Sequence, residues 1–563
     1  MSSRRILDEP LGFFPDHPVP KEEPRPLEVD RVACGVSRRA LLGSTGGLLA
    51  AFTFGDVLVA KGPLREEPES RLGEAVRLRM EAAQAQQGRG RAEQHANGDE
   101  RELSDYLGCF TKALPHDGLG IVDSRAYEVL LEALERGEPE AFESVPLGGY
   151  AKLANPQAAF AFDLVGPDPV QVACPPAPRF SSAETAGEMA EVYWHALLRD
   201  VAFSRYGSDG GVARACEDLS RFSDFRGPKR DERVVPATLF RGPTEGDLVG
   251  PYVSQFLWKR IPYLPMWVDQ AMRTAVPRLD YLDRYERWLE IQNGALGGVN
   301  RFEQLPLYVR NGRDLGEYVH RDFSYQAFLG ACLMLFKFGV PSDGGNPYKH
   351  SRTQSPFATF GQPYALYLLA VVAHLAFKAS WYQKWLVHRR LRPEELAGRV
   401  HNHLAGRARH PIHSDLLESA ALEVTEERQG NHLLCTAYPE GCPIHPSYPA
   451  AHAVVAGACV TILKALFDES YVVPEPVEAT PDGRELHPYG GPPLTVGGEL
   501  DKLASNISIG RDFAGVHYRS DATAGLALGE ELALAVLAEA RATGNELFAG
   551  FSIRRFDGRR VEV

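Results

Sequence analysis

The segment AAHAVVAGACVTILKALF, residues 450–467, is long, apolar and free of internal proline. Small and aliphatic side chains fill it with little polar interruption, which is typical of a helix buried on most sides. Three other long apolar segments share this character: YQAFLGACLMLFKF (325–338), PYALYLLAVVAHLAF (363–377) and DATAGLALGEELALAVLAEA (521–540). Together these segments predict a helical core.

A fifth helix is indicated by the amphipathic segment TAGEMAEVYWHALLRD, residues 185–200. Thr185 and Glu188 have the spacing of a capping box. The apolar residues from Met189 onward recur at i, i+3, i+4, i+7 and i+8, which is one face of a helix. Alternating strand patterns are scarce outside short stretches such as RRVEV at the C-terminus. We therefore predict an all-α protein whose helices pack as bundles, joined by long loops rich in Pro and Gly.

Composition and charge exclude several classes of function. The chain of 563 residues is 44% hydrophobic and 24% charged, with a net charge of -13. A nucleic-acid surface is not expected from this charge, and no basic run of five or more residues occurs. Segment 363–377 contains His374 and is too short for the roughly 20 apolar residues of a bilayer crossing, so we expect a core helix and no transmembrane span.

The chain divides by composition into five parts, of which the last two make up the folded body. These are a flexible polar leader (1–36), a possible export segment (37–60), a helix and linker (61–104), an N-terminal helical half (105–300) and a C-terminal helical half (301–563).

The export segment carries Arg38 and Arg39 ahead of a moderately apolar, glycine-rich stretch. This pattern resembles a twin-arginine signal, which predicts a periplasmic or extracellular protein. Asp56 interrupts the stretch, and the alternative is an ordinary helix start in a cytoplasmic protein.

The eight cysteines are too few for a disulfide scaffold. Cys435 and Cys442 bracket a loop-like stretch, and their spacing permits a disulfide in an oxidising compartment without requiring one.

The first segment with candidate chemistry is KWLVHRRLRPEEL. Pro393 pushes Arg392 out of the α region, so a helix is expected to end there and Arg392 can turn toward the side of Lys384. Arg389 and Arg390 are predicted to be surface charges. Taken alone, the segment also fits a solvated helix end.

The second segment is HPSYPAAHAVVAGA, residues 445–458. Pro449 suits a first helical turn, which leaves the N–H groups of Ala450, Ala451 and His452 without intrahelical acceptors. Such a terminus binds anions, and His452 would lie at its rim. The alternative is a structural histidine.

The third segment is GRDFAGVHYRSDATAG, which contains Arg511, His517 and Asp521. We predict that His517 and Asp521 share one helical face at i, i+4, where the carboxylate fixes the tautomer of the histidine. The other ring nitrogen is then free to bind a metal centre or to attack phosphorus. The alternative is a buried structural pair. Together, the three segments bring several positive groups to one pocket of an acidic protein, which indicates a tetrahedral oxyanion such as phosphate or vanadate.

The order of these motifs resembles the superfamily that joins type 2 phosphatidic acid phosphatases, bacterial class A acid phosphatases and vanadium-dependent haloperoxidases. Longer stretches such as AEVYWHALLRDVAF and WYQKWLVHRRLRPEELAGRV are similar to the algal and cyanobacterial bromoperoxidases, over roughly residues 145–550. This resemblance implies two four-helix bundles, with vanadate bound in the C-terminal one.

The resemblance also implies a role for each site residue. His517 would be the axial vanadium ligand, with Asp521 behind it. Lys384, Arg392 and Arg511 would neutralise the vanadate oxygens, and the Ala451 N–H would add a donor. His452 would hydrogen-bond the apical oxygen and exchange protons, Lys384 would polarise bound peroxide, and His445 would be a more distant acid–base group near the halide.

One position departs from the family pattern Ser-Gly-His, which reads Ala-Ala-His at 450–452. A serine hydroxyl is missing at Ala450, and loss of a hydrogen bond of about 1.5–3 kcal/mol would weaken vanadate binding roughly ten- to a hundredfold. Ala451 keeps its N–H but is stiffer than glycine.

The expected reaction oxidises bromide or iodide with hydrogen peroxide, and the product halogenates a small organic acceptor. The alternatives are a soluble phosphatase with His517 as nucleophile and an inactive oxyanion-binding relative. The resemblance further implies a homo-oligomer, a dimer or larger. A calcium site, known in some relatives, has no acidic cluster that we can assign to it.

Overall fold

Helices make up most of the computed structural model, which describes residues 68–263 and 265–563. The predicted leader (1–36) and export segment (37–60) lie outside these residues. The helices are α2 (Pro68–Arg89), α3 (Asp99–Glu102), α4 (Ser124–Arg136), α5 (Pro139–Phe142), α6 (Ala183–Leu198), α7 (Gly210–Leu219), α8 (Tyr285–Gln292), α9 (Gly312–Arg321), α10 (Gln326–Phe338), α11 (Gln362–Tyr382), α12 (Pro393–Leu404), α13 (Ser414–Leu417), α14 (Ala420–Gln429), α15 (Ala451–Leu466), α16 (Val496–Phe513) and α17 (Arg519–Thr543).

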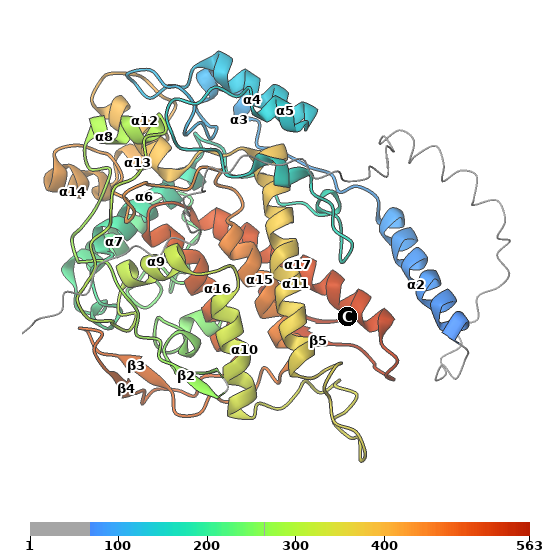
Figure 1. The fold of residues 1–563 in the computed structure, drawn as a ribbon. Coiled ribbons are helices and arrows are strands. Elements are labelled where there is room, and N and C mark those ends of the chain that lie inside the picture. Colours follow the sequence, from blue (N-terminus) through green and yellow to red (C-terminus); the bar gives the residue numbers. More distant parts are fainter. Residues whose placement is uncertain (1–67, 264) are drawn as a thin grey trace, which may run out of the picture. The chain divides into compact units, whose positions relative to one another are not determined.

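Helix α15 is the centre of a bundle whose other members are α11, α16 and α17 (Figure 1). Nearly every side chain of α15 is buried, as its apolar sequence predicts. Of its neighbours, α11 precedes it in the sequence, and α16 and α17 follow it. The expected all-α fold is therefore confirmed, with this bundle in the C-terminal half.

Glycines allow α15 and α17 to lie unusually close together. A Cβ added to Gly529 would lie 2.0 Å from the carbonyl oxygen of Val454, and one added to Gly457 would lie 2.2 Å from that of Leu526. A side chain at either position would force the helices apart. The two helices run in the same direction, and the N–H of Ala450 donates to the carbonyl of Asp521 (3.0 Å). Both N-termini therefore open at one end of the bundle.

A second group of helices, α6, α7, α13 and α14, packs beside α16. The predicted fifth helix is α6, but it begins earlier than the capping-box prediction. The hydroxyl of Ser182, not that of Thr185, caps the helix by accepting from the Thr185 N–H (3.1 Å). Glu188 is free for another role because it lies in the second turn and points into the interior.

Three antiparallel strand pairs complete the described fold. They are β1 (Ile261–Tyr263) with β2 (Met266–Val268), β3 (Val477–Ala479) with β4 (Leu486–Pro488), and β5 (Ser552–Arg554) with β6 (Arg560–Glu562). The RRVEV stretch forms β6. Among the described helices, one continuous helical stretch, Gln362–His388, is long and apolar enough to cross a membrane, and half of its apolar window is buried. It includes α11, which packs on α15 in the core.

Candidate active site

The three predicted segments meet at the N-terminal ends of α15 and α17. Lys384 lies on a π-helical turn, Gln383–His388, and Arg392 precedes α12. Arg511 lies in the last turn of α16. His452 lies in the first turn of α15, and His517 lies in the turn before α17.

His517 contacts Asp521 as predicted, but not on a helical face. Gly515 has a left-handed backbone (φ 81°) that ends the preceding helix, and α17 begins only at Arg519. Asp521 bends back over the helix start, where it accepts from the N–H of Tyr518 (3.2 Å) and from Nδ1 of His517 (2.7 Å). A carboxylate only accepts, so Nδ1 carries the proton and Nε2 keeps a lone pair.

Arg392 joins the first segment to the other two. Its backbone is extended (φ -87°, ψ 159°), as the following proline requires. Its guanidinium donates to Nε2 of His517 (2.8 Å) and to Nδ1 of His445 (3.0 Å). Lys384 is fully buried, and its ammonium donates to the carbonyls of Pro446 (2.7 Å) and Ser447 (2.6 Å).

The electrostatics of this cluster fit an anion. Among the described residues, Lys384, Arg392 and Arg511 are buried cations with no carboxylate partner, and Nε of Arg511 has no hydrogen-bond partner. Burial and the charge of Arg392 hold the pKa of Lys384 well below its ordinary value. Burial, with Arg392 and Lys384, likewise lowers the pKa of His517. A bound oxyanion would relieve this repulsion.

The N-terminus of α15 adds backbone donors. The helix begins at Ala451, so Pro449 lies before it and not in its first turn. Ala450 is the N-cap residue and supplies no side-chain cap. Its own N–H is taken by Asp521, which leaves the N–H groups of Ala451 and His452 without an acceptor among the described residues. This donor set and the three cations fit the oxygens of a vanadate ion.

A residue that the sequence did not single out lies beside His452. Nε2 of His452 is 3.1 Å from Oδ1 of Asp322, whose side chain is buried at the end of α9. The carboxylate therefore holds the proton on Nε2 and leaves Nδ1 as an acceptor. No motif around Asp322 distinguishes it from an ordinary helix-end aspartate, so only the fold brings it to the site.

His445 is buried against the indole of Trp381, with ring centroids 4.8 Å apart. Its Nδ1 accepts from Arg392, since a guanidinium cannot accept. Burial, Arg392 and Lys384 lower the pKa of His445 well below its ordinary value. The ring is therefore neutral, with its proton on Nε2.

Arg390 is the clearest correction to the sequence analysis, because it is buried and not a surface charge. Its guanidinium donates to Oδ1 of Asp521 (3.0 Å), to the hydroxyl of Ser520 (2.8 Å) and to Glu188 on α6. The chain turns inward after the π-helical turn, where Arg389 has a left-handed backbone. Arg389 itself is half-buried and pairs with Glu100 (2.6 Å).

Other side chains outside the cluster show no second metal site. Within residues 68–263 and 265–563, no group of three or more His, Cys, Asp or Glu side chains is arranged to hold a metal ion. Cys435 and Cys442, whose pairing the sequence left open, are both free thiols.

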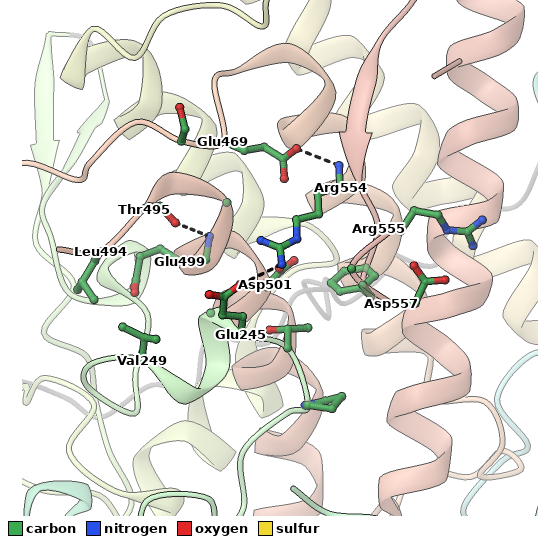
Figure 2. A pocket seen from close by; sticks show the side chains of 18 of the residues that line it. Glu245, Val249, Glu469, Leu494, Thr495, Glu499, Asp501, Arg554, Arg555 and Asp557 are labelled. Atoms are coloured by element: carbon green, nitrogen blue, oxygen red, sulfur yellow. Dashed lines mark hydrogen bonds and ion pairs between the residues drawn. The ribbon is translucent and has the colours of Figure 1, made fainter. Parts of the chain in front are cut away.

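A cavity of about 460 Å³ lies elsewhere, between the start of α16, the β5–β6 pair and the loop around Glu245 (Figure 2). Its charges pair with one another: Arg554 binds Glu245 (2.9 Å), and its N–H donates to Glu469 (2.9 Å). Figure 2 contains none of the predicted site residues. We assign it no part in the chemistry.

Comparison with known proteins agrees with this geometry. The family described as the VCPO second helical-bundle domain matches residues 365–546, which include all three motifs. A vanadium-dependent bromoperoxidase from Ascophyllum nodosum is 35% identical over 525 residues, 88% of this chain and 93% of that protein. One from Corallina pilulifera is 33% identical over 594 residues, 88% of this chain and 99% of that protein.

A solved structure is similar along nearly the whole chain. The homohexameric second vanadate-dependent bromoperoxidase (AnII) of Ascophyllum nodosum superposes with a TM-score of 0.83 at 29% identity, over 92% of this chain and 95% of that one. Relatives of this kind have vanadate as their cofactor. The chain therefore belongs to the vanadium-dependent haloperoxidases and is an oxidoreductase that oxidises halide with peroxide.

Proposed function

We propose that this protein oxidises bromide and iodide with hydrogen peroxide and that the hypohalous product halogenates a small organic acceptor. The bromoperoxidases at 33–35% identity support the choice of halide. The observation that carries the proposal is the lone pair on Nε2 of His517, which accepts from Arg392 and lies close to the charges of Lys384 and Arg511. All three cations are buried, and none has a carboxylate partner within the described part of the chain.

His517 would be the vanadium ligand through Nε2, with Lys384, Arg392 and Arg511 around the oxygens and the Ala451 N–H as a further donor. When bound, vanadate supplies a Lewis-acid centre that activates hydrogen peroxide toward halide. The three cations are held by backbone carbonyls before any substrate arrives, so their charge is preorganised. Lys384 would also polarise the peroxide.

Proton handling falls to His452. Asp322 holds Nε2–H of the ring, so Nδ1 can take a proton from peroxide and return it to a leaving oxygen. The acid–base role expected for His445 requires its Nδ1 or a charged ring, and Arg392 opposes both. We therefore assign His445 a neutral role, in which its Nε2–H donates to the halide.

Assembly, ions and location complete the proposal. We propose a homo-oligomer, because the structurally similar AnII enzyme is homohexameric. We propose no calcium site. Export through residues 37–60 stays a proposal that rests on Arg38 and Arg39. Sequencing the N-terminus of the secreted protein tests whether this segment is cleaved off.

The test is a vanadate titration of the metal-free protein, assayed with hydrogen peroxide and iodide, bromide or chloride. We expect oxidation of iodide and bromide that saturates with vanadate and is lost in His517→Ala. A phosphomonoester is assayed in parallel, since a phosphatase would use His517 as its nucleophile. Efficient ester cleavage without halide oxidation would contradict the proposal, and tight vanadate binding without either turnover would indicate an inactive relative.

A further inference from the structure

The guanidinium of Arg511 is anchored to the described residues through one nitrogen. Its Nη1 donates to the carbonyl of Val319 on α9 (2.8 Å) and to the hydroxyl of Tyr438 (3.4 Å). Within the same residues, Nε and Nη2 make no hydrogen bond. These two nitrogens share one edge of a guanidinium, and such an edge binds an oxyanion through two parallel N–H bonds. The edge that suits an oxyanion is therefore the unused one.

Tyr438 contacts Arg511 with both its hydroxyl and its ring. The hydroxyl donates its proton to the carbonyl of Gly316 on α9 (2.6 Å), so a lone pair of the oxygen is left to accept from Nη1 of Arg511. The guanidinium carbon of Arg511 lies over the ring, 5.5 Å from its centroid, which is a cation–π distance. Neither contact uses the free Nε–Nη2 edge.

The imidazole of His320 holds the ring of Tyr438 in place. The two rings are stacked, with centroids 3.7 Å apart and an angle of 11° between their planes. Two carboxylates fix His320 in turn: its Nε2 lies 2.6 Å from Glu440, and its Nδ1 lies 3.7 Å from Glu317. A row of contacts therefore leads from the half-exposed Glu440 through His320 and the buried Tyr438 to the buried Arg511.

We propose that Tyr438 is a positioning residue for Arg511 and that His320 holds Tyr438 in this role. The contacts at Nη1 and on the ring turn the guanidinium so that its Nε–Nη2 edge faces the vanadate oxygens. This inference rests on the proposed function, because it takes Arg511 as a vanadate-binding residue. Tyr438 and His320 have no contact with vanadate themselves, so their replacement should change the vanadate affinity only through Arg511.

The first experiment compares Tyr438→Phe with Tyr193→Phe in equilibrium binding of vanadate to the metal-free, full-length protein. Tyr193 is a matched control, because it is buried on α6 and its hydroxyl also donates to a main-chain carbonyl, that of His432 (2.6 Å). This contact involves no residue of the site, and both variants should lose similar stability in denaturant titrations. We expect the dissociation constant for vanadate to rise about three- to tenfold in Tyr438→Phe and to stay unchanged in Tyr193→Phe.

A second experiment tests whether Tyr438 acts through Arg511. Tyr438→Phe is measured again in an Arg511→Lys background, because a lysine has no planar edge to be turned. The effect of Tyr438→Phe on the dissociation constant should fall below about twofold there. The inference is wrong if the effect is equal in both backgrounds, if Tyr193→Phe shows the same rise, or if Tyr438→Phe binds vanadate like the wild type. Loss of all vanadate binding in Arg511→Lys leaves the comparison with Tyr193→Phe to decide.

The variants His320→Ala and His320→Phe test the stack. The alanine removes the ring that holds Tyr438 and should raise the dissociation constant about two- to fivefold, whereas the phenylalanine keeps a flat ring there and should restore the wild-type affinity. Equal affinity in these two variants would remove His320 from the inference. A wild type that binds no vanadate and oxidises no bromide would contradict the proposed function itself. An active wild type with unchanged vanadate affinity in Tyr438→Phe would contradict this inference alone.

Discussion

Replacing Arg390 by lysine should weaken vanadate binding although this residue does not face the anion. The Arg390 guanidinium holds Oδ1 of Asp521 at 3.0 Å while the other oxygen of that carboxylate holds His517. A lysine at this depth keeps one ion pair but cannot reach Asp521, Ser520 and Glu188 together. Asp521 would then be free to rotate, and the lone pair of His517 would lose its fixed direction.

The magnitude follows from the bonds lost. Removing one charge-assisted hydrogen bond costs about 1.5–3 kcal/mol, so the free energy of unfolding should fall by that amount. Changing the partner of a metal-ligating histidine typically costs ten- to a hundredfold in metal affinity, and we expect the dissociation constant for vanadate to rise about tenfold or more.

The control is Arg519→Lys. Arg519 also ties the start of α17 to α6, through two hydrogen bonds to Glu191 (2.7 and 2.5 Å), and it is also buried. It makes no hydrogen bond to Asp521. The control should therefore lose similar stability in denaturant titrations and keep its vanadate affinity.

The assay is equilibrium binding of vanadate to the metal-free protein, measured beside the unfolding curve of each variant. Equal vanadate affinity in Arg390→Lys and Arg519→Lys would refute the reasoning, because the role of Arg390 would then be only structural.

Three further changes probe other parts of the structure. Ala450→Ser should tighten vanadate binding roughly ten- to a hundredfold by restoring a hydroxyl donor, and an unchanged binding isotherm would contradict our account of this position. Asp322→Asn should lower kcat for bromide oxidation about ten- to a hundredfold, because Nε2 of His452 loses its fixed proton; vanadate affinity should stay within a few-fold, and an unaltered kcat would remove Asp322 from the proton path. Burial raises the pKa of Asp247 to about 6, so the folded state holds this proton more tightly than the unfolded chain does. The free energy of unfolding should therefore fall by about 3 kcal/mol as the pH rises from about 4 to 6. Asp247→Asn should remove that slope from denaturant unfolding measured across this range, and an identical slope in the variant would contradict the assignment.

The core helices could be predicted from sequence because long runs of apolar side chains without proline indicate buried helices. The apolar run at 450–467 became α15 with one residue lost at each end, since Ala450 is the N-cap residue and Phe467 the C-cap residue. The close approach of α15 and α17 was not predictable in the same way. Gly457 and Gly529 look like ordinary weak points in a helix until the facing backbone is known.

The site residues followed from sequence only where a local motif carries them. Lys384, Arg392, His452 and His517 lie in three short motifs, so their convergence could be predicted. The helical-face geometry of His517 and Asp521 was wrong because a spacing of four residues fits a helix start as well as a helix interior. Asp322 has no motif at all.

Arg390 shows why charge alone misleads in this protein. Arginine at a helix end is usually solvated, and the sequence of residues 384–392 cannot indicate which of its four cations face inward. The hydrogen-bond partner of each buried cation decides whether its charge is available to an anion. Lys112, Arg390 and Arg519 are buried on carboxylates, which neutralise their charge, so none of the three offers it to an anion. Within the described chain, Lys384, Arg392 and Arg511 are buried on carbonyls, hydroxyls and histidine nitrogens alone.

A buried cation held only by neutral groups keeps most of its charge for a ligand. Among residues 68–263 and 265–563, Arg399 is also buried without a carboxylate partner, and its guanidinium donates to the carbonyl of Gly120 (2.6 Å) and to no residue of the site. Convergence therefore matters as much as the missing partner. Mutual repulsion among three such cations around one histidine lone pair lowers the stability of the anion-free fold. An oxyanion that binds there neutralises the repulsion, so its binding to the active site also stabilises the protein.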